Sequence, residues 1–274
     1  MWQCPLCQRA LDTQSKTWRC AGNHSFDCAK SGYVNLLPVQ NKRSLHPGDD
    51  KPMLLARRDF HQAQGYGPLM AHLSDLLAAQ LTSATDLYQL YEAGCGEGAY
   101  LGFIAQALTE RGYQINAAGN DIAKVGVEMA AKKYKQAQFV VASNFSLPLT
   151  SHSQDVILQV FAPGSTSEYA RVLRPGGLLV TVDPGPHHLT ELKARVYDAP
   201  QQHSAPELLA EPWALRQQSD LQFSVDLSDE LTRNGLLKMT PYTWKVTEQR
   251  YTQIVQQLHS VTADFVIRIW QAPL

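Results

Sequence analysis

Residues 87–98 read Leu-Tyr-Gln-Leu-Tyr-Glu-Ala-Gly-Cys-Gly-Glu-Gly. Seven mostly apolar and aromatic residues, typical of a buried strand, lead into three glycines at alternate positions, Gly94, Gly96 and Gly98. A helix-like run, residues 99–109, follows at once. Because glycines let the backbone approach a ligand closely, a strand, a glycine turn and a helix N-terminus together predict a site for a nucleotide-like ligand. Similar turns occur in α/β proteins that bind nothing there, so the remaining sequence must distinguish the two cases.

Strands and helices alternate along the chain after this turn. Residues 155–161 are almost wholly apolar, which is the composition of a central parallel strand. A helix is predicted at residues 125–134, and another ends near residue 177. Further strands are predicted at residues 117–121, 138–144, 178–183, 223–227 and 265–270, the last two as a closing pair with a helix between them. This order predicts an α/β fold with a Rossmann-like, seven-stranded sheet.

Length and composition are ordinary for a globular protein. The 274 residues, 44% hydrophobic and 18% charged, allow one large domain or a medium domain with a small appendage. No apolar run approaches the roughly 20 residues that span a bilayer. The N-terminus, Met-Trp-Gln-Cys-Pro, lacks the basic start and apolar core of an export signal. We therefore expect a cytoplasmic protein without a membrane partner.

Charge is distributed unevenly along the chain. The formal net charge is −1, but residues 1–60 carry nine Lys and Arg against five acids, so this part is +4 and the remainder is −5. A basic N-terminal part on a mildly acidic body indicates local contact with a polyanion. A chance asymmetry of a solvated surface explains the same numbers, and charge alone leaves both interpretations open.

Four of the five cysteines fall within the first 28 residues. Cys4 and Cys7 form a Cys-x-x-Cys turn, and Cys20 with His24 supplies a second pair, which together can complete a tetrahedral zinc site. Four ligands with no open position describe a structural site, and so short a segment needs the metal to fold. Cys28 could replace His24, but His24 lies closer to Cys20 and is preferred. In a cytosolic chain this clustering favours metal over disulfides.

Residues 32–60 connect this segment to the rest of the chain. Residues 32–37 resemble a short strand, and Lys42 and Arg43 begin a polar, proline-punctuated connector. Tyr33 and Phe60, lying among Lys and Arg, could form an RNA surface on which bases stack. The alternative is that both rings belong to a small core, and for Phe60 the core is the preferred interpretation.

A helix is predicted directly before the glycine-turn strand. Pro68 is suited to the first turn of a helix, with Tyr66 at its head. Apolar side chains recur at helical spacing through about four turns, at positions 69, 70, 73, 76, 77 and 81. We predict three parts: a zinc-binding domain over residues 1–45, a connector and leading helix over 46–83, and a catalytic domain over 84–274.

Two acids flank the ligand that the glycine turn would hold. Asp121 ends the second strand, where a carboxylate can accept both ribose hydroxyls; alternatively it only caps the helix that starts at Ile122. Glu92 precedes the turn, which suits the cationic amino group and sulfonium of S-adenosylmethionine but not a pyrophosphate. The Gly-x-Gly-x-Gly spacing and the Arg174-Pro-Gly-Gly177 turn also favour a methyltransferase over a dinucleotide oxidoreductase. We therefore predict S-adenosylmethionine as the cofactor.

Motifs along nearly the whole chain resemble the 23S rRNA (guanine-N1)-methyltransferase family, in particular its branch from Gram-negative bacteria. The motifs are Cys4-x2-Cys7-x12-Cys20-x3-His24 and the segments at 32–37, 47–49, 56–58, 92–98, 184–193 and 239–244. One difference is Glu92, where the family more often carries Asp; the carboxylate is kept. The resemblance implies a class I methyltransferase domain, a zinc ribbon that helps to recognise an rRNA hairpin, and a homodimer whose two zinc domains flank an RNA-binding cleft.

The resemblance also implies particular site residues. The metal ligands fall on Cys4, Cys7, Cys20 and His24, with one structural zinc per chain. Cofactor contacts fall on Tyr66, Gly96, Glu97, Asp121 and His188. The residues themselves add Glu92, Gly94, Gly98 and Asn144, which stand in the turn or at the exit of the third strand.

Methyl transfer to guanine N1 needs a group that accepts the N1 proton. Candidates near the carboxyl edge of the sheet are Asp183, His188 and Glu191, although each could instead be a helix cap, a cofactor contact or a solvated side chain. The target base must leave its stack to reach a buried sulfonium. Phe145 and Phe161 are candidate stacking partners, with core packing preferred for Phe161.

Two other functions remain open at this point. A methyltransferase acting on a small metabolite would transfer methyl groups without RNA, whereas a phosphate-led RNA complex weakens steeply with salt. A non-catalytic zinc- and adenosylmethionine-binding regulator would bind the cofactor but transfer no methyl group to rRNA.

Overall fold

A computed structural model describes residues 1–41, 48–83, 85–204 and 206–273. The predicted basic start of the connector, Lys42 and Arg43, lies outside these residues. No helix in the described ranges has the length and apolar character needed to cross a membrane.

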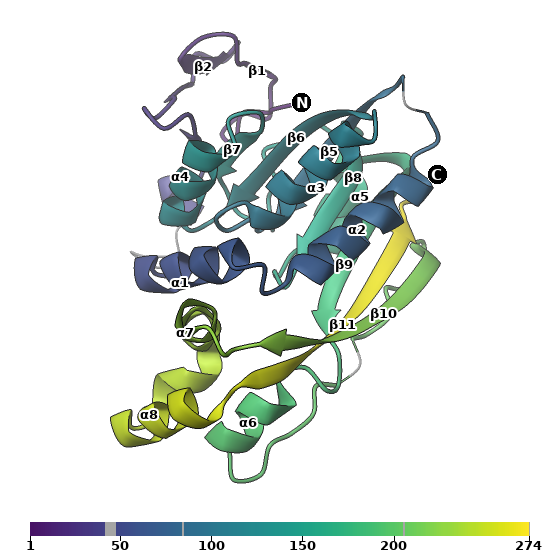
Figure 1. Ribbon diagram of the computed structural model, residues 1–274. Helices are drawn as coiled ribbons and strands as arrows, with labels where there is room; N and C mark the ends of the chain where they lie inside the picture. Colours follow the sequence, from purple (N-terminus) through teal and green to yellow (C-terminus); the bar gives the residue numbers. More distant parts are fainter. Residues whose placement is uncertain (42–47, 84, 205, 274) are drawn as a thin grey trace.

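One eight-stranded sheet organises the molecule, in the order β10-β11-β9-β8-β5-β6-β7-β4 (Figure 1). The strands are β4 (Val34–Asn35), β5 (Leu87–Ala93), β6 (Gln114–Asp121), β7 (Gln138–Val141), β8 (Gln154–Val160), β9 (Leu173–Pro184), β10 (Ala214–Asp226) and β11 (Ser260–Gln271). The strands from β4 to β9 in this order pair in parallel, whereas β11 pairs antiparallel to both β9 and β10. The predicted seven-stranded class I methyltransferase sheet is confirmed, and β4 adds a two-residue edge strand from the N-terminal segment.

Helices cover both faces of this sheet. They are α1 (Lys51–Gln62), α2 (Gly67–Gln80), α3 (Ala99–Glu110), α4 (Lys124–Lys133), α5 (Thr166–Val172), α6 (Thr190–Val196), α7 (Glu230–Met239) and α8 (Glu248–Gln257), with 3₁₀ turns η1 (Val39–Asn41) and η2 (Pro241–Lys245). The predicted leading helix is α2, which begins at Gly67-Pro68 and buries its leucines. The core on the face of α2 and α3 is separate from the core that α5 shares with the N-terminal segment.

Helix α1 was not predicted from the sequence. Asp50 caps it, accepting a hydrogen bond from the Met53 backbone at 2.8 Å, and Pro52 stands in its first turn. Both are start signals of a helix. The proline and the charges of this segment had instead suggested a connector.

The N-terminal segment is a small three-stranded sheet, β1 (Leu11–Asp12), β2 (Thr17–Cys20) and β3 (Ser25–Asp27), that packs on the main sheet. Trp2 is 3% exposed and lies 5.4 Å from Trp18 and 6.1 Å from Tyr91 of β5, measured between ring centroids. Its indole Nε1 donates to Gln138 Oε1 at 2.6 Å. The segment is therefore attached to the catalytic body by buried aromatic contacts. The domain boundary at residue 45 stays a prediction.

The structure decides the roles of two aromatic residues. Tyr33 and Phe60 are buried in the main core, at 6% and 0% exposure. The RNA-surface prediction for Tyr33 is therefore wrong, and Phe60 is a core residue as preferred, but of the main core instead of a small one.

The closing pair of strands is longer than predicted and carries a second lobe. Three helical elements, α7, η2 and α8, stand between β10 and β11, where one helix was expected. Together with α6 they form the lower part of the molecule in Figure 1. This lobe contributes one wall of the cavity described below.

Candidate functional site

The predicted metal ligands come together in the N-terminal segment. The ligand atoms of Cys4, Cys7, Cys20 and His24 all lie within 4.8 Å of one another. His24 Nδ1 is 3.5 Å from both Cys4 Sγ and Cys20 Sγ, and Cys7 Sγ is 3.5 Å from Cys20 Sγ. Zn–S and Zn–N bonds of roughly 2.3 and 2.0 Å give tetrahedral edges of about 3.5–3.8 Å. The four residues fit a structural zinc ion, and in the described part of the chain Cys28 stands outside the cluster.

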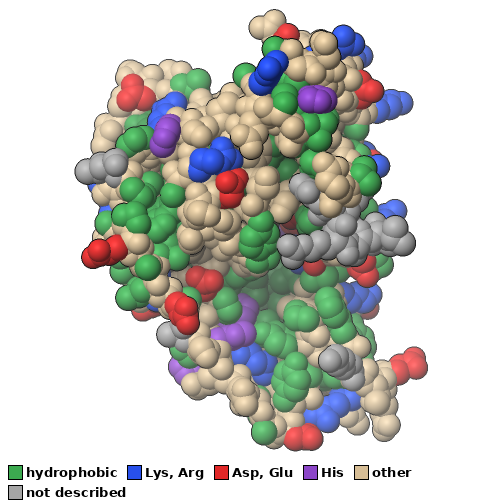
Figure 2. All heavy atoms as spheres, turned by 180° about the vertical axis from the view of Figure 1, so that it is seen from behind, with side chains coloured by type: hydrophobic (Ala, Val, Ile, Leu, Met, Phe, Trp, Pro, Cys, Tyr) green, Lys and Arg blue, Asp and Glu red, His purple; other side chains and the backbone are tan. Residues whose placement is uncertain are grey.

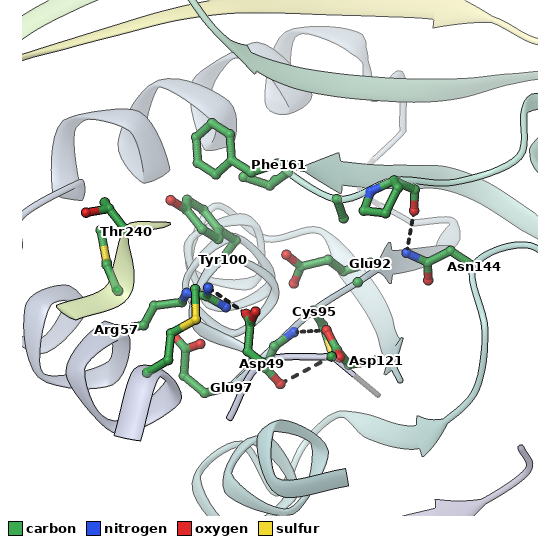
Figure 3. A pocket seen from close by; sticks show the side chains of 18 of the residues that line it. Asp49, Arg57, Glu92, Cys95, Glu97, Tyr100, Asp121, Asn144, Phe161 and Thr240 are labelled. Carbon is green, nitrogen blue, oxygen red and sulfur yellow. Dashed lines mark hydrogen bonds and ion pairs between the residues drawn. The ribbon is translucent and has the colours of Figure 1, made fainter. Parts of the chain in front are cut away.

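A cavity of about 690 Å³ opens at the carboxyl edge of the sheet, where ligands bind in folds of this kind. Figure 2 shows a hollow between the larger and smaller parts of the molecule, with histidine and hydrophobic side chains in it. The cavity is lined by the glycine turn, α1, the ends of β6, β8 and β9, and η2 (Figure 3). Of the predicted site residues, it contains Tyr66, Glu92, Gly94, Gly96, Glu97, Asp121, Asn144, Asp183 and His188.

The three glycines adopt backbone conformations that other residues rarely take. Gly94, Gly96 and Gly98 have φ of 80°, 52° and 81°. A side chain on Gly94 would also place its Cβ 2.5 Å from Cβ of Ala162. Gly98 does not line the cavity; it caps the start of α3. The turn therefore needs glycine for its shape, and this shape brings the backbone to the cavity.

Glu92 lies beneath the turn at 1% exposure. Its Oε2 accepts a hydrogen bond from the backbone of Leu101, in the first turn of α3, at 3.0 Å. Burial, and to a smaller extent the nearby carboxylates of Glu97 and Asp121, raises the pKa of Glu92 well above its usual value. A cationic group of a ligand would stabilise the ionised form, which fits the amino group or sulfonium predicted here.

Glu97 is paired with His61 of α1. The distance from His61 Nδ1 to Glu97 Oε1 is 2.6 Å, and the two residues are 8% and 3% exposed. Burial acts to raise the pKa of Glu97, but the His61 hydrogen bond and the charges of His61 and Arg57 outweigh it, so the pKa is lowered. Glu97 therefore carries a negative charge in the cavity at neutral pH.

Helix α1 contributes cavity residues that were not predicted from the sequence. His61 and Arg57 line the cavity, and Arg57 forms an ion pair with Asp49 at 2.7 Å. Residues 56–58 are one of the motifs of the family resemblance, but nothing in the local pattern connects them with the glycine turn. The capping signature of α1 could have revealed the helix but not the contact.

Asp121 is held at the cavity by two backbone hydrogen bonds, and its predicted contact with ribose stays a prediction. Its Oδ2 accepts from the Gly96 backbone at 2.8 Å, and its Oδ1 accepts from the Ala123 backbone at 2.7 Å. Ala123 is the residue that precedes α4, which begins at Lys124 rather than Ile122. Burial raises the pKa of Asp121, while these two hydrogen bonds act in the opposite direction. The carboxylate thus ties the turn to the start of α4 while it lines the cavity.

His188 is held in a neutral form. Its Nδ1 accepts a hydrogen bond from the Asp264 backbone at 3.3 Å, which leaves the proton on Nε2, 3.4 Å from the hydroxyl of Tyr66. Burial, with further contributions from His203 and Lys193, lowers the pKa of His188 to about 3. An imidazole of such low basicity is poorly suited to accept a proton.

The other two candidates for the proton acceptor differ in position. Asp183 stands near the end of β9 and lines the cavity, and burial raises its pKa although Arg268 acts to lower it. Glu191 lies elsewhere: both of its oxygens accept hydrogen bonds from Thr262, at 2.8 and 2.6 Å, and it is not among the cavity-lining residues of the described ranges. Asp183 is the candidate that faces the cavity with a raised basicity.

Two further cavity residues bear on the fit of a cofactor. The hydroxyl of Tyr100 is buried and has no hydrogen-bond partner among the residues that the structure describes. A polar ligand group would satisfy it. Asn144 is already engaged, since its Oδ1 accepts from Asn120 at 2.8 Å and its Nδ2 donates to the Pro163 carbonyl at 2.9 Å. The carboxylates of Glu92, Glu97 and Asp121 and the unpartnered hydroxyl of Tyr100 fit a ligand with cationic and polar groups.

The fold and these two sites define the class: an S-adenosylmethionine-dependent class I methyltransferase with a zinc ribbon. Residues 2–45 match a zinc-ribbon family described as RlmA, N-terminal, and residues 91–181 match a methyltransferase domain. A protein of Micromonospora griseorubida named as a candidate 23S rRNA (guanine-N1)-methyltransferase is 33% identical over 71% of this chain and 69% of its own. The chain belongs to the 23S rRNA (guanine-N1)-methyltransferase family.

Two other relatives extend this similarity. A candidate 23S rRNA (guanine-N1)-methyltransferase of Bacillus subtilis is 29% identical over 98% of this chain and 96% of its own length. The 23S rRNA (guanine(748)-N1)-methyltransferase of Streptomyces fradiae is 33% identical over 69% of this chain and 65% of its own. The alignment with the first of these covers the zinc ribbon and the catalytic domain together.

Proposed function

We propose that this protein transfers a methyl group from S-adenosylmethionine to N1 of a guanine in 23S rRNA. The observation that carries the proposal is the carboxylate of Asp183, of raised pKa, in the cofactor cavity of a chain that also bears a family-specific zinc ribbon. A carboxylate of this kind suits an acceptor atom that must lose a proton, as guanine N1 does.

Different cavity residues bind different parts of the cofactor. Asp121 accepts hydrogen bonds from the ribose hydroxyls, and Glu92 and Glu97 face the cationic groups. The left-handed turn at Gly94 and Gly96 lets the backbone lie against the ligand. Bound S-adenosylmethionine supplies an electrophilic methyl group on a sulfonium. These residues fix its direction, and positioning contributes much of the acceleration of an in-line displacement.

Asp183 accepts the proton that guanine N1 loses. In the transfer, the bond from N1 to the methyl carbon forms, the bond from that carbon to sulfur breaks, and the bonding electrons stay on sulfur. The N1 proton passes to a carboxylate oxygen of Asp183. A raised pKa makes this carboxylate a stronger base than an exposed aspartate.

The zinc ribbon is the part that selects RNA. This segment carries exposed cations that suit phosphate groups: Arg9, Lys16, Arg19 and Lys30. The ribbon is fixed to the catalytic sheet through Trp2, so RNA bound there has a defined position relative to the cavity. We further propose that the protein is a cytoplasmic homodimer, in which two ribbons flank one RNA; sedimentation of the purified protein tests the dimer.

Transfer of labelled methyl groups tests the proposal against its alternatives. The protein is incubated with labelled S-adenosylmethionine and 23S rRNA from a strain that lacks its gene, and the nucleosides are separated by mass spectrometry. We expect label in 1-methylguanosine, and a rate that falls steeply with salt. Label in small metabolites without RNA would favour a metabolite methyltransferase. Cofactor binding with no transfer to either substrate would favour a regulator.

A further inference from the structure

Phe161 lies at the end of β8 in a backbone conformation that is unusual for its residue type. Its φ is +53°, a region that favours glycine, and its backbone N–H donates to the Val182 carbonyl of β9 at 3.2 Å. Strained residues of this kind persist where the surrounding structure fixes them, and they concentrate at ligand sites. The strain is the first sign that Phe161 serves a ligand.

The ring of Phe161 projects into the cavity. It is 43% exposed although it stands at the end of a buried strand, so core packing, the preferred role from the sequence, does not describe it. Other rings lie near it: the Phe265 centroid is at 5.4 Å, Tyr100 at 6.3 Å and Tyr66 at 6.4 Å. The exposed side of an aromatic ring held in this way offers a flat apolar surface to a ligand.

The loop that follows Phe161 is fixed on both sides. A side chain at Gly94 would collide with Ala162, which shows how closely the loop approaches the glycine turn. The Pro163 carbonyl accepts a hydrogen bond from Asn144 Nδ2 at 2.9 Å. The position of the ring is therefore set before any ligand binds, which reduces the entropy that binding would cost.

Phe161 stands at the acceptor end of the cavity rather than at the adenosine end. Figure 3 shows Phe161 on one side of the cavity, and Asp121, the acid proposed to bind the ribose, on the other. The strand register pairs Val160 with Val182, so Phe161 is adjacent to Asp183 across neighbouring strands. Both Phe161 and Asp183 line the cavity, so an aromatic ring and a carboxylate follow one paired position of neighbouring strands.

We propose that Phe161 is the residue on which the target guanine stacks, with the N1 edge of the base directed to Asp183. This inference rests on the proposed function and names the substrate subsite within it. A guanine taken out of its helix loses stacking on its neighbours, and a ring in the cavity replaces part of that loss. Guanine presents N1–H and an exocyclic amino group along one edge, and a carboxylate can accept from both.

Substitution of the ring tests this subsite. We expect Phe161→Leu to lower kcat/KM for 23S rRNA by roughly 5- to 150-fold, the usual range for loss of one base–aromatic stack. Affinity for S-adenosylhomocysteine, measured by calorimetry, should change less than about twofold, because the stack contributes to binding of the guanine and not to binding of the cofactor. Phe161→Tyr, which keeps the ring, should restore most of the activity.

A second variant separates stacking from folding. Phe161→Gly removes the ring but suits the positive φ, so the protein should fold while transfer to rRNA is lost to the same degree as in Phe161→Leu. Phe145→Leu provides the comparison. Phe145 is also exposed in the cavity, but it follows β7, which is separated from β8 in the sheet by β5 and β6. It should lower cofactor affinity more than it changes transfer at saturating cofactor.

Three results would overturn the inference: Phe161→Leu with wild-type kcat/KM, an equal loss of cofactor affinity, or a selective loss of transfer in Phe145→Leu alone. The wild-type protein distinguishes failure of the subsite from failure of the proposed function. If wild type forms no 1-methylguanosine, the function is wrong; if it does and Phe161→Leu is unaffected, only the subsite is wrong.

Discussion

The zinc cluster and the cofactor cavity are built in opposite ways. All four zinc ligands come from the short segment between Cys4 and His24, whereas the residues that line the cavity range from Gly48 to Tyr242. In the first site a metal ion supplies the free energy that a small core cannot. In the second, a large sheet holds glycines of positive φ and buried carboxylates in place. A local site can thus be formed by one short segment, whereas a distributed site depends on the whole fold.

Loss of one zinc ligand should have the largest effect, and it should affect rRNA methylation far more than cofactor binding. Structural zinc contributes on the order of 10–16 kcal/mol in small zinc-binding peptides. We expect Cys20→Ser to lose its zinc by elemental analysis and to lower rRNA methylation at least about 100-fold, while cofactor affinity stays within about threefold. Cys28→Ser is the matched control, because Cys28 stands outside the cluster and should retain both zinc and activity.

Asp183→Asn should act on the cavity alone. General-base catalysis contributes roughly 10²- to 10⁴-fold, so kcat should fall by that factor with unchanged affinity for S-adenosylhomocysteine. Wild-type activity requires the ionised carboxylate of Asp183. The activity should therefore be present at pH values above the raised pKa of Asp183 and be lost as the pH falls through that pKa. The residual rate of the variant should lack this acid limb, and Glu191→Gln should keep it. An identical pH profile in wild type and Asp183→Asn would contradict the assignment.

Trp2→Ala tests whether the two regions are joined as the structure indicates. A buried tryptophan truncated to alanine costs about 3–5 kcal/mol, and here the loss should detach the ribbon from the sheet. Urea unfolding measures the change, with Leu6→Ala, an exposed ribbon position, as the control. A loss below about 1 kcal/mol would show that the ribbon is not held by this contact.

The smallest expected effect concerns two buried hydroxyl groups without partners. Tyr100 and Tyr169 both carry one, but only Tyr100 lines the cavity in the part of the chain that the structure describes. A hydrogen bond gained from the cofactor contributes about 0.5–1.5 kcal/mol. Tyr100→Phe should therefore weaken S-adenosylhomocysteine binding by roughly 2- to 13-fold, and Tyr169→Phe should leave it unchanged. Equal effects of both variants on S-adenosylhomocysteine binding would contradict a hydrogen bond between the Tyr100 hydroxyl and the cofactor.

The same contrast explains what the sequence could predict. The zinc ligands could be predicted because they are close together in the sequence. The glycine turn and the order of strands were sufficient to predict the class I sheet. His61 and Arg57 were missed because α1 meets the glycine turn only after the chain folds, across a long sequence separation. Tyr33 was misassigned because a ring among charged residues does not reveal which side the core occupies. Asp183 and Glu191 look alike in sequence, and only the fold shows that one faces the cavity.

The most direct test of the account is to map the methylated position on 23S rRNA by reverse transcription. Methylation at N1 blocks the pairing edge of guanine, so the polymerase stops there. The account predicts one stop, at a single guanine in a hairpin, after incubation with wild-type protein and S-adenosylmethionine. It predicts no stop with Asp183→Asn or Cys20→Ser at the same protein concentration. Stops at many guanines, or label in the RNA without any stop, would contradict a ribbon that selects the RNA and a cavity that methylates N1.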